Sequence, residues 1–122
     1  MTTATTARQA VGRHGENVAA RTVADLGWEV LARNWRCTHG EIDLVAVDGD
    51  ELVVIEVKTR RSARYGTPAE AVTPAKVARL RRLAAAYLGA QQRRYAGVRL
   101  DVIAVTLPRA GSAHVEHLRA VG

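Results

Sequence analysis

Two strongly apolar segments, residues 40–47 and 51–58, lie close together in the chain, and a short Asp-Gly turn joins them. Both segments also contain acidic residues. Each segment is apolar on both faces, which is typical of central strands in a covered sheet and not of a solvated hairpin. A carboxylate in such a strand is costly unless a partner neutralises it. The pattern therefore predicts a buried antiparallel hairpin with charged side chains gathered near one edge.

The register of this hairpin follows from the turn and from the two-residue period of a strand. A short turn pairs Val47 with Leu52. This register places Asp43 opposite Glu56, and places Lys58 opposite the acid two residues before Asp43. A shift by one residue would move Asp43 among apolar side chains, whereas a shift by two keeps the same charged groups on one face. Either allowed register collects two or three carboxylates and one ammonium group.

Three interpretations of this acidic cluster differ in what neutralises it. The charges could simply be hydrated at a strand end, or Lys58 could form a structural salt bridge that leaves one carboxylate in excess. A divalent cation removes that excess, because Mg²⁺ binds one or two carboxylates together with waters and substrate oxygens. We therefore favour a Mg²⁺ (or Mn²⁺) site that includes Asp43 and Glu56. Glu16 and Glu41 fit equally well as members of the site and as surface residues.

Basic residues follow the acidic hairpin. Residues 41–57 contain six acids and no lysine or arginine, whereas residues 58–99 contain eleven basic residues and one acid. Sixteen of the eighteen basic residues are arginine, which suits bidentate contacts to phosphate. This distribution predicts a polyanionic partner held next to an acidic pocket. We expect this partner to be a nucleic acid, DNA more readily than RNA. The residues expected to contact its phosphates are Arg60, Arg61, Arg64, Lys76, Arg79 and Arg82.

Length and composition predict one domain over residues 8–122, preceded by a disordered leader at residues 1–7. No membrane-length apolar run or secretory signal is present in the sequence. The single cysteine, Cys37, is compatible with a reducing cytoplasm, so we expect a cytoplasmic protein without a membrane partner.

Hydrophobic periodicity gives the order of the elements. We expect a helix at 5–26, strands at 28–33, 36–47 and 51–58, a loop at 60–73, a helix at 74–88, and strands at 99–107 and 113–118. Thr73-Pro74 starts the second helix as N-cap and first helical residue, with Lys76, Arg79 and Arg82 facing outward. Asp101, in a buried strand, is expected to pair with an arginine. The last strand is a possible edge for a homodimer.

These motifs resemble the PD-(D/E)XK, or restriction-endonuclease-like, nuclease superfamily. The resemblance is closest to a small uncharacterised bacterial family of YraN-like proteins, and it covers residues 13–107. Ile42 occupies the position of the superfamily's proline before the first aspartate. The matching segments are Gly15-Glu16, residues 40–45, residues 54–60 with Glu56-Val57-Lys58, and residues 71–76.

The resemblance implies an α/β fold in which helices flank a central mixed sheet, similar to Holliday-junction resolvases, in the order α-β-β-β-α-β-β. It also implies Mg²⁺-dependent phosphodiester hydrolysis, here expected on branched or duplex DNA. In that reaction Asp43, Glu56, the Val57 carbonyl and Glu16 would hold the metal, Lys58 would stabilise charge at the phosphate, and Glu41 would belong to the catalytic group. The alternative is a non-catalytic nucleic-acid-binding module that keeps the fold.

Overall fold

The structure, a computed structural model, describes residues 3–61 and 66–122 of the 122-residue chain. Its elements are α1 (Thr3–Asp25), β1 (Glu29–Cys37), β2 (Gly40–Asp48), β3 (Glu51–Arg60), the 3₁₀ helix η1 (Pro68–Ala71), α2 (Pro74–Gly89), β4 (Gly97–Thr106) and β5 (His114–Leu118). Apart from the short η1, this is the predicted order of helices and strands.

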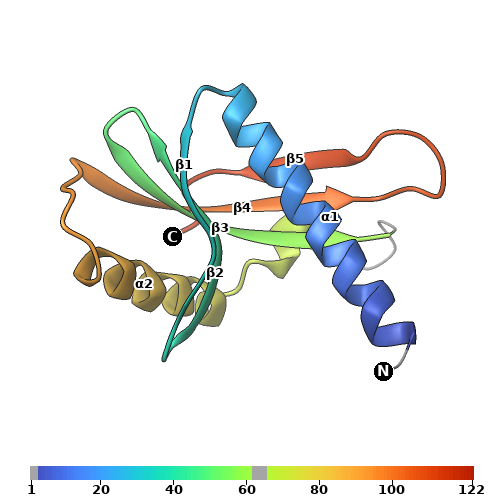
Figure 1. Cartoon of the computed structure of the whole chain (residues 1–122), viewed down its shortest axis with the longest axis horizontal. Coiled ribbons are helices and arrows are strands. Elements are labelled where there is room, and N and C mark those ends of the chain that lie inside the picture. The colour runs from blue at the N-terminus through green and yellow to red at the C-terminus, as the bar shows by residue number, and fades with distance from the viewer. Residues whose placement is uncertain (1–2, 62–65) are drawn as a thin grey trace.

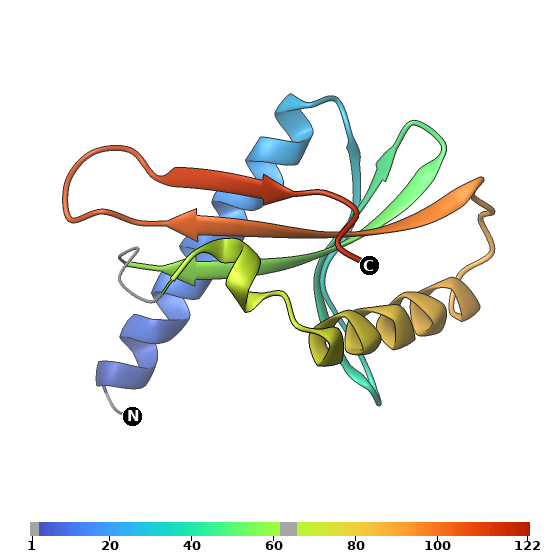
Figure 2. The ribbon, with the colours of Figure 1, turned by 180° about the vertical axis from the view of Figure 1, so that it is seen from behind.

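The five strands form one sheet in the order β1-β2-β3-β4-β5. Strands β3 and β4 run parallel, and the other neighbours run antiparallel. Helix α1 crosses one face of the sheet and α2 covers the other (Figure 1), as the view from behind also shows (Figure 2). The predicted mixed sheet flanked by helices is therefore confirmed.

The central strand β3 is apolar on both faces because each face packs against a helix. Ile55 lies in a buried cluster with Val23 of α1, whereas its neighbour Val54 lies in a second cluster with Leu83 of α2. All four side chains are fully buried. The double-sided apolar pattern of the sequence thus reflects two helix–sheet layers that share one strand.

The first hairpin differs from the prediction in its bounds. The strand predicted over residues 36–47 crosses the turn at Thr38 and His39, so this prediction is wrong. Strand β1 instead continues to Cys37, which pairs with Gly40, and Trp35 and Cys37 pack against the cluster under α2. Partial burial of these two side chains accompanies the extension of β1 beyond the polar residues at its centre.

Helix α1 is longer than predicted. It begins at Thr3, so residues 3–7, which we expected in a disordered leader, are helical, while residues 1–2 lie outside the described part of the chain. Ala7 and Val11 line a groove against the end of β3, which gives this first half of α1 a tertiary contact. Within the described residues, no helix is both long and apolar enough to cross a membrane.

Candidate active site

Strands β2 and β3 separate at Asp43. Their pairing starts at the turn and includes the predicted Val47–Leu52 pair, and it ends at Leu44 and Ile55. Asp43 is one residue farther from the turn than Leu44. Its side chain reaches β3, where its Oδ2 accepts a hydrogen bond from the Val57 N–H at 2.8 Å. This contact satisfies a backbone donor at the point where the strands separate. It also fixes the Asp43 carboxylate beside Glu56.

The other three predicted acids act electrostatically on Asp43, although one of them, Glu41, also forms an ion pair with Arg36 at 3.8 Å. Burial of the Asp43 side chain raises its pKa to about 6, and the hydrogen bond from Val57 acts in the opposite direction. The carboxylates of Glu16, Glu56 and Glu41 raise the pKa of Asp43 further. Three elements, α1, β2 and β3, therefore supply negative charge to one place, and burial makes that charge costly.

This electrostatic cost predicts the effect of Asp43→Asn on stability. The pKa of the folded state lies above the ordinary value of 3.8, so the folded state binds the proton more tightly, and stability falls as the pH rises from about 4 to about 6. Asparagine can still accept the Val57 hydrogen bond without the charge. We expect Asp43→Asn to raise the free energy of unfolding by about 1–3 kcal/mol at pH 7.5 and to change it little at pH 4. Urea denaturation at both pH values measures this, with Asp50→Asn in the exposed turn as control. A variant less stable than the wild type at pH 7.5 would contradict it.

Gly15 sets how closely α1 approaches the site. A Cβ atom added at Gly15 would lie 1.9 Å from Thr59 Oγ1 and 2.8 Å from Thr59 Cβ, so only glycine fits against β3 here. The next residue is Glu16, whose carboxylate acts on Asp43. The Gly15-Glu16 pair therefore combines a close helix–strand contact with the placement of an acid.

We expect Gly15→Ala to destabilise the fold, because the added methyl group must push α1 away from Thr59 or distort it. Overpacking of this kind costs about 1–3 kcal/mol. Gly12→Ala is the matched control, since a Cβ at Gly12 meets nothing within 4 Å and alanine favours a helix. Thermal denaturation of both variants measures the difference, and equal melting temperatures would contradict the expectation.

Cations from α2 lie on the other side of the site. Arg79 forms an ion pair with Glu56, which is almost completely buried. Burial, and then the ammonium group of Lys58, lower the pKa of Lys76, which places these two lysines close together. The prediction that Lys76 and Arg79 face outward is therefore wrong, since both are half-buried and turn toward β3. Their aliphatic stems can pack on the sheet while the charged ends reach the acids, which periodicity alone does not reveal.

The donor set suits a hard divalent cation in its chemistry. Asp43, Glu56 and Glu16 offer carboxylate oxygens, and the peptide at Val57 adjoins both strand acids. In the arrangement adopted by residues 3–61 and 66–122, no three acidic, histidine or cysteine side chains converge enough to hold an ion. Glu56 is meanwhile occupied by Arg79. The residues therefore fit Mg²⁺ by type, and a cation would have to draw the carboxylates together.

A basic groove of about 410 Å³ lies between α1 and the end of β3, and its lining includes Thr59, the residue that contacts Gly15. It is lined by Arg8, Arg60 and Arg61 together with small and apolar residues. Arg8 was not among the predicted phosphate contacts, although it lies eight residues before Glu16 and thus near the same face of the helix. Arg60 also donates a hydrogen bond to the Gly66 carbonyl at 2.7 Å, so its guanidinium group already has one partner within the protein.

The remaining predicted phosphate contacts have different positions. Arg82 is exposed on α2, whereas Arg64 lies outside the described residues.

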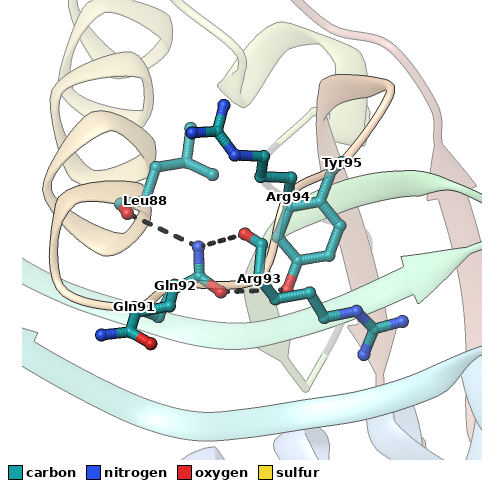
Figure 3. A pocket seen from close by; sticks show the side chains of 6 residues that line it. All are labelled: Leu88, Gln91, Gln92, Arg93, Arg94 and Tyr95. Atoms are coloured by element: carbon teal, nitrogen blue, oxygen red, sulfur yellow. Dashed lines mark hydrogen bonds between the residues drawn. The ribbon is translucent and has the colours of Figure 1, made fainter.

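A separate hollow of about 620 Å³ occurs where α2 leads into β4, and its lining includes Arg93, Arg94 and Tyr95 (Figure 3). This hollow lies at the end of the sheet where β3 begins, because Gly97, which follows it, pairs with Glu51. It is therefore away from Glu56, which pairs with Val102 further along β3. Sequence patterning did not predict it.

Asp101 belongs to a structural network. Its fully buried carboxylate accepts hydrogen bonds from Arg99 Nε at 3.0 Å, Arg99 Nη2 at 3.1 Å and the Ala120 N–H at 3.1 Å, and it contacts His117 Nε2 at 2.8 Å. The hydrogen bonds from Arg99 to Asp101, and then that to Asp48, raise the pKa of Arg99 above its usual value, and burial acts in the opposite direction. The predicted pairing of Asp101 with an arginine is confirmed, and the pair ties β4 to the C-terminal segment.

Comparison with known proteins identifies the family. Residues 15–105, which include the acids at the separation of β2 and β3, match the model of "Uncharacterised protein family UPF0102". The chain belongs to this family. It is similar to a UPF0102 protein of Beutenbergia cavernae, with 56% identity over 116 residues covering 95% of this chain and 98% of that relative. A UPF0102 protein of Kineococcus radiotolerans is 57% identical over 116 residues, covering 94% of this chain and 95% of that relative. The matched family is the YraN-like one that the sequence motifs resemble.

Proposed function

We propose that the protein is a metal-dependent nuclease that binds duplex or branched DNA and hydrolyses its phosphodiester bonds. The observation that carries this proposal is the gathering of three carboxylates around that of Asp43, beside Lys58 and Lys76. Perturbed pKa values and uncompensated buried charge are concentrated at functional sites more often than elsewhere. Neither the packing of the sheet nor the buried Arg99–Asp101 pair needs these acids.

In this mechanism Asp43, Glu56 and Glu16 would hold Mg²⁺ or Mn²⁺ with help from the Val57 carbonyl. A metal bound there would supply an activated water and neutralise charge at the scissile phosphate. Lys58 donates to the phosphoryl oxygens, where a fixed cation lowers the barrier as negative charge grows. The Val57 N–H keeps the Asp43 carboxylate oriented, and Glu41 adds to the negative potential that attracts the cation.

The arginines near the site support a nucleic-acid substrate. Arg8, Arg60 and Arg61 line a groove between α1 and the end of β3, the strand that contains Glu56, and Arg82 is exposed on α2. Contacts from arginine to phosphate position a duplex without reading its sequence, and their contribution falls as salt concentration rises. We therefore propose binding that is sensitive to salt and largely independent of sequence.

Metal omission tests the proposal. A labelled four-way DNA junction and its linear arms are incubated with the protein in Mg²⁺ or in EDTA. Products that form only in Mg²⁺ are the expected result. Binding without cleavage in Mg²⁺ and in Mn²⁺ would instead favour a non-catalytic nucleic-acid-binding module.

Binding is tested through its salt dependence. We expect Arg61→Ala to weaken duplex binding and to lower the slope of log affinity against log salt by about 1, since one phosphate contact is lost. Arg21→Ala, an exposed position elsewhere on α1, is the charge-matched control. Fluorescence anisotropy over a salt series measures both slopes, and identical slopes would place the binding surface elsewhere.

A further inference from the structure

Arg79 and Glu56 differ strongly in their access to solvent. The side chain of Glu56 is 11% exposed, whereas that of Arg79 is 43% exposed. A carboxylate buried to this extent needs a counterion at all times. Its arginine partner, by contrast, is accessible to an anion that arrives from solvent.

We propose that Arg79 is an exchangeable counterion: it neutralises Glu56 while the metal site is empty, and it transfers to a phosphate of the nucleic acid when a divalent cation takes over Glu56. This inference rests on the proposed function, because it assumes that the same site binds both a metal and a nucleic acid. Arg79 would thus couple the binding of the metal to the binding of the nucleic acid.

The geometry of α2 supports this exchange. Lys76 and Arg79 lie three residues apart and so share one side of the helix, next to β3. Lys76 also lies beside Lys58, and within the described residues neither lysine forms a salt bridge with an acid. An arriving phosphate would therefore meet Lys58 and Lys76 already in place. Arg79 could then join them by leaving Glu56.

The excess negative charge of the acids around Asp43 also favours this exchange. Glu56 is one of the three carboxylates that raise the pKa of Asp43, so these acids repel one another even with Arg79 present. A divalent cation neutralises two of them, whereas Arg79 supplies only one positive charge. Exchange of Arg79 for the cation therefore lowers the repulsion and frees a guanidinium group that suits bidentate binding to phosphate.

Thermodynamic linkage turns this exchange into a measurable coupling. If nucleic acid draws Arg79 away from Glu56, it raises the affinity for the metal, and the metal must raise the affinity for nucleic acid by the same factor. Removal of Arg79 should then have opposite effects on the two ligands. Metal affinity in the absence of DNA should increase, because the competing counterion is gone, and DNA affinity in the presence of metal should decrease.

The experiment measures Mn²⁺ affinity by electron paramagnetic resonance of the free ion. Wild type, Arg79→Met and Arg79→Gln are compared, with and without a short phosphorothioate DNA duplex that resists cleavage. Arg81→Met, which removes an exposed arginine from the same helix, is the control. We expect Arg79→Met to bind Mn²⁺ alone about three- to tenfold more tightly than the wild type. We also expect the duplex to raise the Mn²⁺ affinity of the wild type and of Arg81→Met by a larger factor than that of Arg79→Met, in which only direct contacts between the metal and phosphate oxygens remain.

The outcomes separate this inference from the proposed function. Mn²⁺ binding that is unchanged or weaker in both folded Arg79 variants would overturn the exchange and leave the proposed metal site intact. Equal enhancement by DNA in wild type and Arg79→Met would also overturn it. A wild-type protein that binds no Mn²⁺ would overturn the exchange and the metal-dependent function together. Circular dichroism establishes whether each variant is folded. If Arg79→Met does not fold, Arg79→Gln takes its place in the comparison.

Discussion

Replacing Glu56 with glutamine is expected to reduce DNA cleavage by about 100- to 1000-fold while the protein stays folded. Glutamine keeps the shape of the side chain and can still accept a hydrogen bond from Arg79, but it removes the charge that would hold the metal. Loss of a group that stabilises charge in the transition state has effects of this size. Single-turnover cleavage with protein in excess over labelled DNA measures the rate.

The control for this prediction is Glu116→Gln, which removes an exposed carboxylate from the edge strand β5. Its cleavage rate should equal that of the wild type. DNA binding by Glu56→Gln should be retained or become stronger, since a negative charge near the phosphates is lost. Cleavage by Glu56→Gln at the wild-type rate would exclude this carboxylate as a metal ligand.

Asp101→Ala is expected to produce the largest loss of stability, about 3 kcal/mol. The substitution leaves Arg99 and the Ala120 N–H without the buried acceptor that both use. Breaking a buried ion pair by removing one partner costs about 3–5 kcal/mol. The lower end applies here, because Arg99 keeps contacts to Asp48 at 2.9 Å and Glu51 at 3.2 Å. Equilibrium denaturation in urea measures the change.

Asp50→Ala is the control for this stability effect. Asp50 is exposed in the hairpin turn, so its replacement should change the free energy of unfolding by less than about 0.5 kcal/mol. If Asp101→Ala were as stable as Asp50→Ala, the network around Arg99 would contribute nothing to the fold.

The sequence was sufficient to predict the central hairpin, because its information is local. The apolar pattern over residues 40–58 has a two-residue period and a short turn, which together allow few registers, and the predicted Val47–Leu52 pair is present. The charged residues Asp43 and Glu56 stood out because an acid in a buried strand is unusual. The helix start at Thr73 was equally local, since its side chain accepts a hydrogen bond from the Lys76 N–H at 3.2 Å.

Other features depend on contacts between distant segments, which one sequence does not encode in a visible pattern. Glu16 joins the acids only because Gly15 allows α1 to touch Thr59, about forty positions later in the chain. Arg79 fits an outward-facing helical position by periodicity, yet its long side chain reaches Glu56. The same holds for the end of β1, where Trp35 and Cys37 are partly buried although the segment around them is polar.

We propose that the acids at the separation of β2 and β3 carry out metal-dependent cleavage of nucleic acid. The most direct test compares wild type with Glu56→Gln on labelled duplex, single-stranded, flap and four-way-junction DNA and on structured RNA, with Mg²⁺ and with Mn²⁺. We expect products from wild type on duplex or branched DNA, and almost none from Glu56→Gln. Equal product formation by both proteins, or no product from wild type on any substrate, would contradict it.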